Sequence, residues 1–191
     1  MAKRSDKRER LINAAKELFY KQGFSSTTIA DIAKLADVPL GNVYYYFKTK
    51  DEICAAVINE RNIEVNSILT EFNLLNTVTE RLIAIIDYYS VRAEQVSQYG
   101  NIFSGLAQEL SRQQNPLAIK AREILTTLSN WLTTQFKSVY ANDAEKQATK
   151  FLSTLQGMQV LTLAFQDPSI TATQADLLKA EVAALTIREV A

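Results

Sequence analysis

The spacing of apolar residues is the feature that most limits what this chain can fold into. Apolar side chains recur three and four positions apart along almost the whole length, whereas sustained strict alternation is scarce. The first spacing gathers side chains on one face of an α-helix, and the second is typical of a half-buried strand. Only five glycines and three prolines occur among 191 residues, which is few for a protein dense in turns. The sequence therefore predicts an all-α fold.

Helix-start signals fall between the apolar stripes. Thr28, Thr49 and Thr77 are each followed three residues later by an acidic side chain, the spacing of a capping box. Asn115 precedes Pro116, which is typical of an N-cap followed by proline at the first helical position. These signals predict about nine helices, near residues 7–22, 29–36, 40–47, 50–72, 78–97, 99–112, 116–140, 143–165 and 173–190.

The end of the first helix also carries a signal. Its apolar stripe stops at Gly23, and glycine suits the left-handed position that follows a helix. Phe24 is then expected to fold back onto Phe19.

Several features bear on where the protein works. No apolar run approaches the 18 residues of a membrane-spanning helix, and no apolar segment follows the basic N-terminus as in a secretory signal. The single cysteine, Cys54, cannot form an internal disulfide and is expected to be a small core residue rather than a redox sensor. These features favour a cytoplasmic protein with no membrane partner.

The zero net charge hides an asymmetry along the chain. Residues 1–50 carry ten Lys and Arg against five Asp and Glu, and residues 51–191 carry eleven against sixteen. A basic head on an acidic body favours contact between the head and a polyanion, although an uneven surface is the simpler alternative. Basic residues near the N-terminus could either solubilise the chain or contact DNA, and they are Lys3, Arg4, Lys7 and Arg8.

Residues 28–47 carry the functional signal. Two very short predicted helices follow each other with only a few residues between them. The residues expected to face inward are Ile29, Ile32, Ala33, Val38, Val43 and Phe47. Small Ala33 and Ala36 allow the two helix axes to approach closely. This pattern predicts a helix-turn-helix that presents its second helix to a major groove.

The opposite side of the second helix would then meet DNA. Its residues are Leu40, Gly41, Asn42, Tyr44, Tyr45 and Tyr46. Glycine costs a helix about 1 kcal/mol relative to alanine, which close approach to DNA would offset. Three consecutive tyrosines cannot all face one core, so at least one hydroxyl is available to a phosphate oxygen. The Asn42 amide can read adenine with two hydrogen bonds, or it could be an ordinary solvated helix residue.

This segment resembles the TetR/AcrR family of bacterial repressors. The resemblance covers residues 7–60, and the matching residues are Thr28, Ile32, Ala33, Ala36, Val38, Gly41, Tyr44, Tyr46, Phe47, Lys50 and Ile53. It implies phosphate contacts from Thr28, Tyr44, Tyr46 and Lys50, and base reading near Gly41, Asn42 and Tyr45. Asp37 replaces the family's usual turn glycine, and Pro39 replaces its usual capping serine. Aspartate tolerates the left-handed region better than most residues, so neither change removes the motif.

The resemblance also implies what the rest of the chain does. It divides the chain into a DNA-binding domain at 1–49 and a helical domain for effector binding and dimerisation at 50–191. Large side chains that could line an effector pocket, or simply fill a core, are Phe103, Leu106, Trp131 and Met158. Two stripes expected to form a four-helix dimer interface are Phe151, Leu155 and Met158, and Leu178, Val182 and Leu185.

These observations favour a sequence-specific, ligand-responsive repressor, released from a palindromic operator by a small hydrophobic effector. A non-specific architectural DNA-binding protein is the alternative, although it would carry basic charge more widely. An enzyme is disfavoured because histidine is absent and no glycine-rich phosphate loop or nucleophile motif is present. No cofactor or metal is expected.

Overall fold

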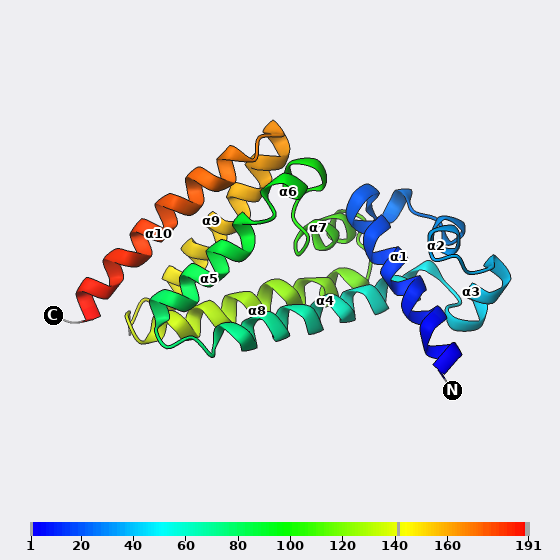
Figure 1. Cartoon of the computed structure of the whole chain (residues 1–191), viewed down its shortest axis with the longest axis horizontal. Coiled ribbons are helices and arrows are strands. Elements are labelled where there is room, and N and C mark those ends of the chain that lie inside the picture. The colour runs from blue at the N-terminus through cyan, green and yellow to red at the C-terminus, as the bar shows by residue number, and fades with distance from the viewer. Residues whose placement is uncertain (1, 141, 190–191) are drawn as a thin grey trace. The chain divides into compact units, whose positions relative to one another are not determined.

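The computed structural model describes residues 2–140 and 142–189. These residues contain ten α-helices and no strand. The helices are α1 (Ala2–Ser26), α2 (Ile29–Leu35), α3 (Leu40–Tyr46), α4 (Lys50–Phe72), α5 (Val78–Ser90), α6 (Ala93–Tyr99), α7 (Gly105–Arg112), α8 (Leu117–Lys137), α9 (Ala144–Phe165) and α10 (Ser169–Glu189) (Figure 1). The predicted all-α fold is confirmed. None of these helices is both long and apolar enough to cross a lipid bilayer.

Several local predictions are also confirmed. Thr28 caps α2 and Thr77 caps α5, each in a complete capping box with the acidic residue three positions later. Gly23 takes a φ of 85° and breaks α1 before its last turn, and the ring of Phe24 packs edge-on against that of Phe19, with 5.4 Å between centroids. Because each signal involves residues close in sequence, it could be predicted without knowing the tertiary fold.

The region between residues 78 and 112 differs from the prediction of two helices at 78–97 and 99–112. Helix α5 ends at Ser90, where the Arg92 guanidinium donates to the Tyr88 carbonyl at 2.6 Å and lies 3.6 Å from the centre of the Tyr88 ring. Helix α6 ends at Tyr99 and is followed by Gly100, whose φ of 82° is left-handed. The break beside Arg92 therefore divides the helix predicted at 78–97, and the break at Gly100 delays the start of the next helix to Gly105.

The described helices pack as two compact units. The N-terminal unit comprises Met1–Ile63 and Ile102–Glu123, and the C-terminal unit comprises Glu64–Asn101 and Ile124–Ala191. This division differs from the predicted boundary after residue 49, since α7 and the first residues of α8 group with α1–α3. Chain connectivity therefore joins the two units at three points, in α4, before α7 and within α8.

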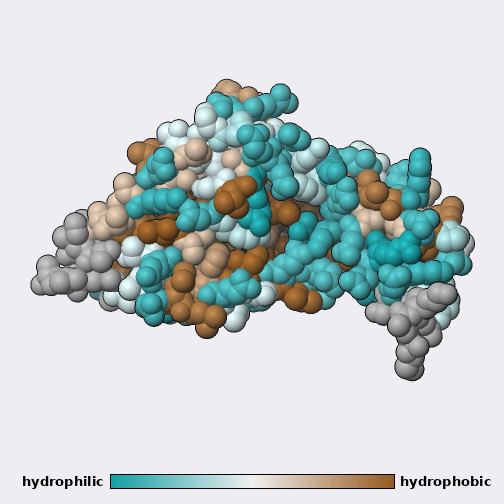
Figure 2. Space-filling view, in the orientation of Figure 1, coloured by the Kyte–Doolittle hydropathy of each residue, from teal (hydrophilic) through white to brown (hydrophobic). Residues whose placement is uncertain are grey.

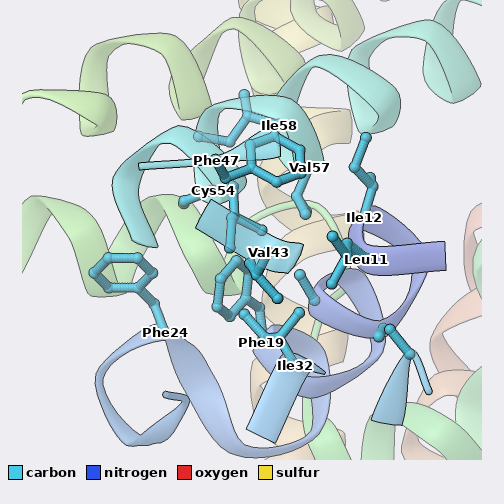
Figure 3. Close-up of a cluster of buried hydrophobic side chains, with 14 of the residues drawn as sticks. Leu11, Ile12, Phe19, Phe24, Ile32, Val43, Phe47, Cys54, Val57 and Ile58 are labelled. Carbon is cyan, nitrogen blue, oxygen red and sulfur yellow. The ribbon is translucent and has the colours of Figure 1, made fainter. Parts of the chain in front are cut away.

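The N-terminal unit has its own hydrophobic core. Its buried residues come from α1, α2, α3, α4 and α7, together with Ala118 and Ala121 of α8. Figure 3 shows Val43 of α3 pointing toward Phe19 of α1 and Ile32 of α2, with Phe47 beside Cys54 and Val57 of α4. The two short helices thus share one core with two longer ones.

Cys54 belongs to this core. Burial raises the pKa of its thiol to about 12, and the nearby carboxylates of Asp51 and Glu109 add to the effect. A thiol with so high a pKa stays neutral at physiological pH, and the neutral form is a poor nucleophile. This supports the expectation of a core residue rather than a redox sensor.

The C-terminal unit is built mainly on contacts of α10 with α5 and α9, and of α6 with α9. Side chains that the sequence assigned to the dimer interface are buried inside this single chain, namely Phe151, Leu155, Met158, Leu178 and Val182, while Leu185 is partly buried. They fill the core of the subunit, which corrects the expectation that they face a partner. An apolar stripe on an amphipathic helix has the same spacing in either case.

Candidate nucleic-acid interface

Helix α2 begins at a residue that can also face a ligand. The hydroxyl of Thr28 accepts from the Asp31 amide at 3.1 Å and donates to the Asp31 carboxylate at 2.6 Å. Hydrogen bonds from the Thr28 side chain and backbone hold the pKa of Asp31 below its usual value. Thr28 is exposed, so this well-ordered residue lies at the surface where the resemblance implies a phosphate contact.

The turn between α2 and α3 is fixed by an arginine from α1. Asp37 takes a left-handed φ of 50°, and the Val38 amide donates back to the Ala33 carbonyl at 3.0 Å. The Arg10 guanidinium donates to the carbonyls of Ala36 and Asp37 and, at 3.0 Å, to the Asp37 carboxylate. The Asp37 side chain adds an exposed ionic contact to Arg10, and aspartate tolerates the left-handed region better than most residues.

Helix α3 is held by two side chains. Val43 is fully buried and Phe47 is 4% exposed, and both lie in the N-terminal core (Figure 3). Pro39 at the N-cap makes no side-chain hydrogen bond to the helix. Packing rather than capping therefore fixes the orientation of this seven-residue helix.

The opposite face of α3 is open to solvent. Tyr44 and Tyr45 are 46% and 58% exposed, and Leu40, Gly41 and Asn42 are exposed as well. A Cβ atom on Gly41 would meet nothing within 4 Å, so the packing of the chain itself does not require glycine there. The structure thus brings four of the predicted DNA-contacting residues, Gly41, Asn42, Tyr44 and Tyr45, onto one exposed surface.

Tyr46 and Lys50 differ from the other predicted contacts. Tyr46 is partly buried against the core, with its ring 5.0 Å from that of Tyr45. The Lys50 ammonium donates to the carbonyls of Phe24 at 2.8 Å and Thr27 at 3.0 Å. Lys50 therefore orders the loop that precedes α2, rather than presenting its ammonium outward as a phosphate ligand.

Other basic residues surround this face. Arg8 is exposed and lies 5.3 Å from the centre of the Phe47 ring, and Lys34 and Lys48 are exposed as well. The side chains of Lys3 and Arg4 lie outside the described residues. Exposed cations of this kind can bind the phosphates of a polyanion.

Two residues that order this region were not identified from the sequence. Arg10 holds the turn, and Glu109 of α7 accepts hydrogen bonds from the last turn of α1, after its break at Gly23. Their partners lie 27 and about 85 residues away along the chain, so no local pattern marks them. Among the described Cys, Asp and Glu side chains, no group of three could hold a metal ion.

The predicted effector residues are divided between the two units. Phe103 and Leu106 belong to the N-terminal unit, and Trp131 and Met158 belong to the C-terminal unit. Phe103, Trp131 and Met158 are buried, and Leu106 is partly buried. The Trp131 indole donates to the Asn73 side-chain oxygen at 2.9 Å and packs beside Phe72.

Comparison with known proteins bears directly on this interface. The family model described as bacterial regulatory proteins, tetR family, matches residues 11–57, which include all of α2 and α3. The chain is 26% identical over 183 residues to an HTH-type transcriptional regulator of Lactococcus lactis subsp. lactis, covering 90% of this chain and 91% of the relative. The chain belongs to the TetR family. It is a DNA-binding transcriptional regulator with a helix-turn-helix.

Other TetR-family relatives match most of the chain. The HTH-type transcriptional repressor NemR of Escherichia coli K12 is 26% identical over 157 residues, 82% of this chain and 78% of NemR. A TetR-family regulator from Streptomyces coelicolor has the same fold, with a TM-score of 0.83 at 18% identity over 97% of each chain. The TetR-family fold therefore extends through the helices that follow the DNA-binding motif.

Proposed function

We propose that this TetR-family protein is a repressor that binds a pseudo-palindromic operator as a homodimer and leaves it when a small effector binds. The observation that carries the proposal is the exposed face of α3, with Asn42, Tyr44 and Tyr45 directed outward while Val43 and Phe47 anchor the helix. A short helix anchored in this way can enter a major groove without being remodelled.

Each exposed residue suits a particular contact. The Asn42 amide can donate to N7 and accept from the N6 amino group of adenine, which distinguishes adenine from the other bases. The hydroxyls of Thr28, Tyr44 and Tyr46 suit phosphate oxygens, and Tyr45 is the most exposed aromatic side chain of α3. Gly41 leaves room for a base edge or backbone to approach the helix.

We infer that the dimer forms through exposed side chains of α9 and α10, and not through the buried stripes at Phe151 and Leu178. Val160, Leu161 and Phe165 are exposed on α9, and Leu177 is exposed on α10. The face in Figure 2 shows hydrophobic patches between polar residues. Exposed Ala180 and Ala184 continue the α10 stripe and allow close approach. Packing two such pairs of helices would remove this apolar surface from water.

We further infer that the effector is small and uncharged. No charged side chain is buried in the described residues, and burying an unpaired charge is costly. The C-terminal unit instead buries neutral polar groups: the Gln156 amide donates to the Tyr89 hydroxyl at 3.0 Å. The buried Gln156 Oε1 and Gln159 Nε2 atoms have no hydrogen-bond partner. An effector with a hydroxyl or amide could satisfy them, so we add hydrogen-bonding groups to the expected hydrophobic effector. Trp131 and Met158 remain candidate contacts in this unit.

The first prediction tests direct readout of the operator. The wild-type protein is first used to enrich a preferred duplex from a random pool. Asn42→Ala should weaken binding to this enriched duplex by about 1–3 kcal/mol, because the lost contact is to a base. Binding to random duplex should change little. Gel-shift titration at fixed salt measures both affinities, with Asn130→Ala, an exposed asparagine of α8, as the matched control. Equal loss on both duplexes would contradict readout by Asn42, and a wild-type protein without preference would make it an architectural DNA-binding protein.

The second prediction concerns the dimer. The interface is expected to bury more than about 1,000 Å². Leu161→Glu should convert the protein from dimer to monomer at micromolar concentration, because burying an unpaired carboxylate in this interface is costly. Light scattering gives the mass. Leu74→Glu, at a side chain that is 80% exposed outside α9 and α10, should remain dimeric. A monomeric wild type, or a dimeric Leu161→Glu variant, would refute this interface.

The third prediction concerns the effector. Trp131 is the only tryptophan, so its fluorescence reports on one place in the chain. Among matched aromatic alcohols, amides, carboxylates and amines, the neutral compounds should change this fluorescence. Saturating operator should weaken their binding by the same factor by which they weaken operator binding. Preferential binding of the charged compounds, or binding that operator leaves unchanged, would exclude this effector class or this form of control.

A further inference from the structure

A carboxylate from α7 binds residues 23–27, the loop formed where α1 breaks at Gly23 and its last turn leads into α2. Glu109 accepts hydrogen bonds from the backbone amides of Phe24 and Ser25, both at 2.8 Å, and from the Ser25 hydroxyl at 2.6 Å. The Gln113 amide donates to the same carboxylate at 3.3 Å. All these residues lie in the N-terminal unit, although Glu109 is separated from the loop by about 85 positions.

The electrostatics favour the ionised form of Glu109. Partial burial would raise the pKa of its carboxyl group, but the hydrogen bonds from Ser25 and Phe24 outweigh burial and leave the pKa below its usual value. Hydrogen bonds to an ionised acceptor are stronger than those between neutral groups. The charge of Glu109 is therefore part of what holds the loop.

The same loop is also bound by a cation from α4. The Lys50 ammonium donates to the carbonyls of Phe24 and Thr27 and lies 4.2 Å from the centre of the Phe24 ring. The carboxylate of Glu109 thus accepts hydrogen bonds from amides of the loop, while the ammonium of Lys50 donates to its carbonyls. We call these two sets of contacts the loop clamp.

Gly23 fits this arrangement for two reasons. Its φ of 85° is rarely adopted by residues with a side chain, and a Cβ atom there would lie 3.0 Å from Glu109 Oε2. The Thr27 hydroxyl donates to the Gly23 carbonyl at 2.7 Å and closes the loop on itself. The backbone from residue 23 to residue 27 is therefore ordered by contacts with α7, with α4 and within itself.

The loop leads directly into the N-cap of α2. Thr28 follows Thr27, and its exposed hydroxyl is one of the phosphate contacts proposed above. A change in the loop would move Thr28 and the first turn of α2, even though neither Glu109 nor Lys50 needs to touch DNA.

We propose that Glu109 is a positioning residue for DNA binding, which acts through the loop clamp to keep Thr28 and the start of α2 in their DNA-binding conformation. The proposal rests on the DNA-binding function proposed above. Without the clamp, only a fraction of molecules has the loop in place, and the apparent affinity for DNA falls by that fraction.

Glu109→Gln tests this with almost no change in shape. The glutamine amide would turn an NH2 group toward a backbone N–H, so one backbone hydrogen bond and the charge are lost together. Affinity for the duplex enriched by the wild-type protein should fall by about tenfold, as expected for losing a hydrogen bond to a charged group. Glu123→Gln changes the charge equally at an exposed residue of α8 in the same unit, and it should bind like the wild type.

Two further readouts separate positioning from a general loss of stability. Circular dichroism at the temperature of the binding assay should show Glu109→Gln to be folded. Amide hydrogen exchange by NMR should be faster at Phe24 and Ser25, with the core amides of α1 unchanged. If Glu109→Gln does not fold, Ser25→Ala should show a smaller loss of affinity with the same local increase in exchange. This substitution removes a hydroxyl that donates to Glu109 and accepts from Gln113, and it leaves the carboxylate and the backbone amides in place.

The outcomes are distinct. The proposal would be overturned if Glu109→Gln bound the enriched duplex as tightly as the wild type while amide exchange at Ser25 became faster. It would also be overturned if Glu109→Gln and Glu123→Gln lost equal affinity for that duplex. A wild-type protein that does not distinguish the enriched duplex from random DNA would instead refute the DNA-reading function on which the proposal rests.

Discussion

The burial of Val43 and Phe47 is the constraint on which the DNA-binding face depends. Helix α3 has seven residues, and an isolated helix shorter than about 12–15 residues is marginal in water. It also begins without a side-chain cap at Pro39. Packing into the core shared by α1, α2 and α4 supplies the stability that length and capping do not. Because the inward face is fixed by two side chains, the outward face is free of packing and can carry the residues proposed to contact DNA.

Polar contacts from distant parts of the chain complete this arrangement. Arg10 holds the turn between α2 and α3 by binding backbone carbonyls and the Asp37 carboxylate. Lys50 and Glu109 hold the loop before α2 by binding its carbonyls and amides, respectively. In each case a charged side chain binds backbone groups at a place where a helix breaks or ends. The motif therefore depends on α1, α4 and α7 as well as on its own residues.

The sequence predicted the features that depend on neighbouring residues. The capping boxes at Thr28 and Thr77, the left-handed Gly23, the packing of Phe24 on Phe19 and the exposed face of α3 all follow from local spacing. It did not predict the roles of Lys50 and Glu109, because the residues that they bind are far away in the sequence and no local spacing identifies such a pair. The stripes at Phe151 and Leu178 were assigned to a partner subunit, but they pack inside this one. Spacing identifies an apolar face and cannot say which surface covers it. The effector residues remain predictions for the same reason.

The central claim is that a dimer places the outer face of α3 in two successive major grooves. Methylation interference at guanine N7, an atom that lies in the major groove, tests this on the duplex enriched by the wild-type protein. We expect two clusters of interfering positions within a pseudo-palindrome, with centres about 10 base pairs apart, the spacing set by one helical turn. A single cluster, or uniform binding of methylated duplexes without interference, would contradict the account.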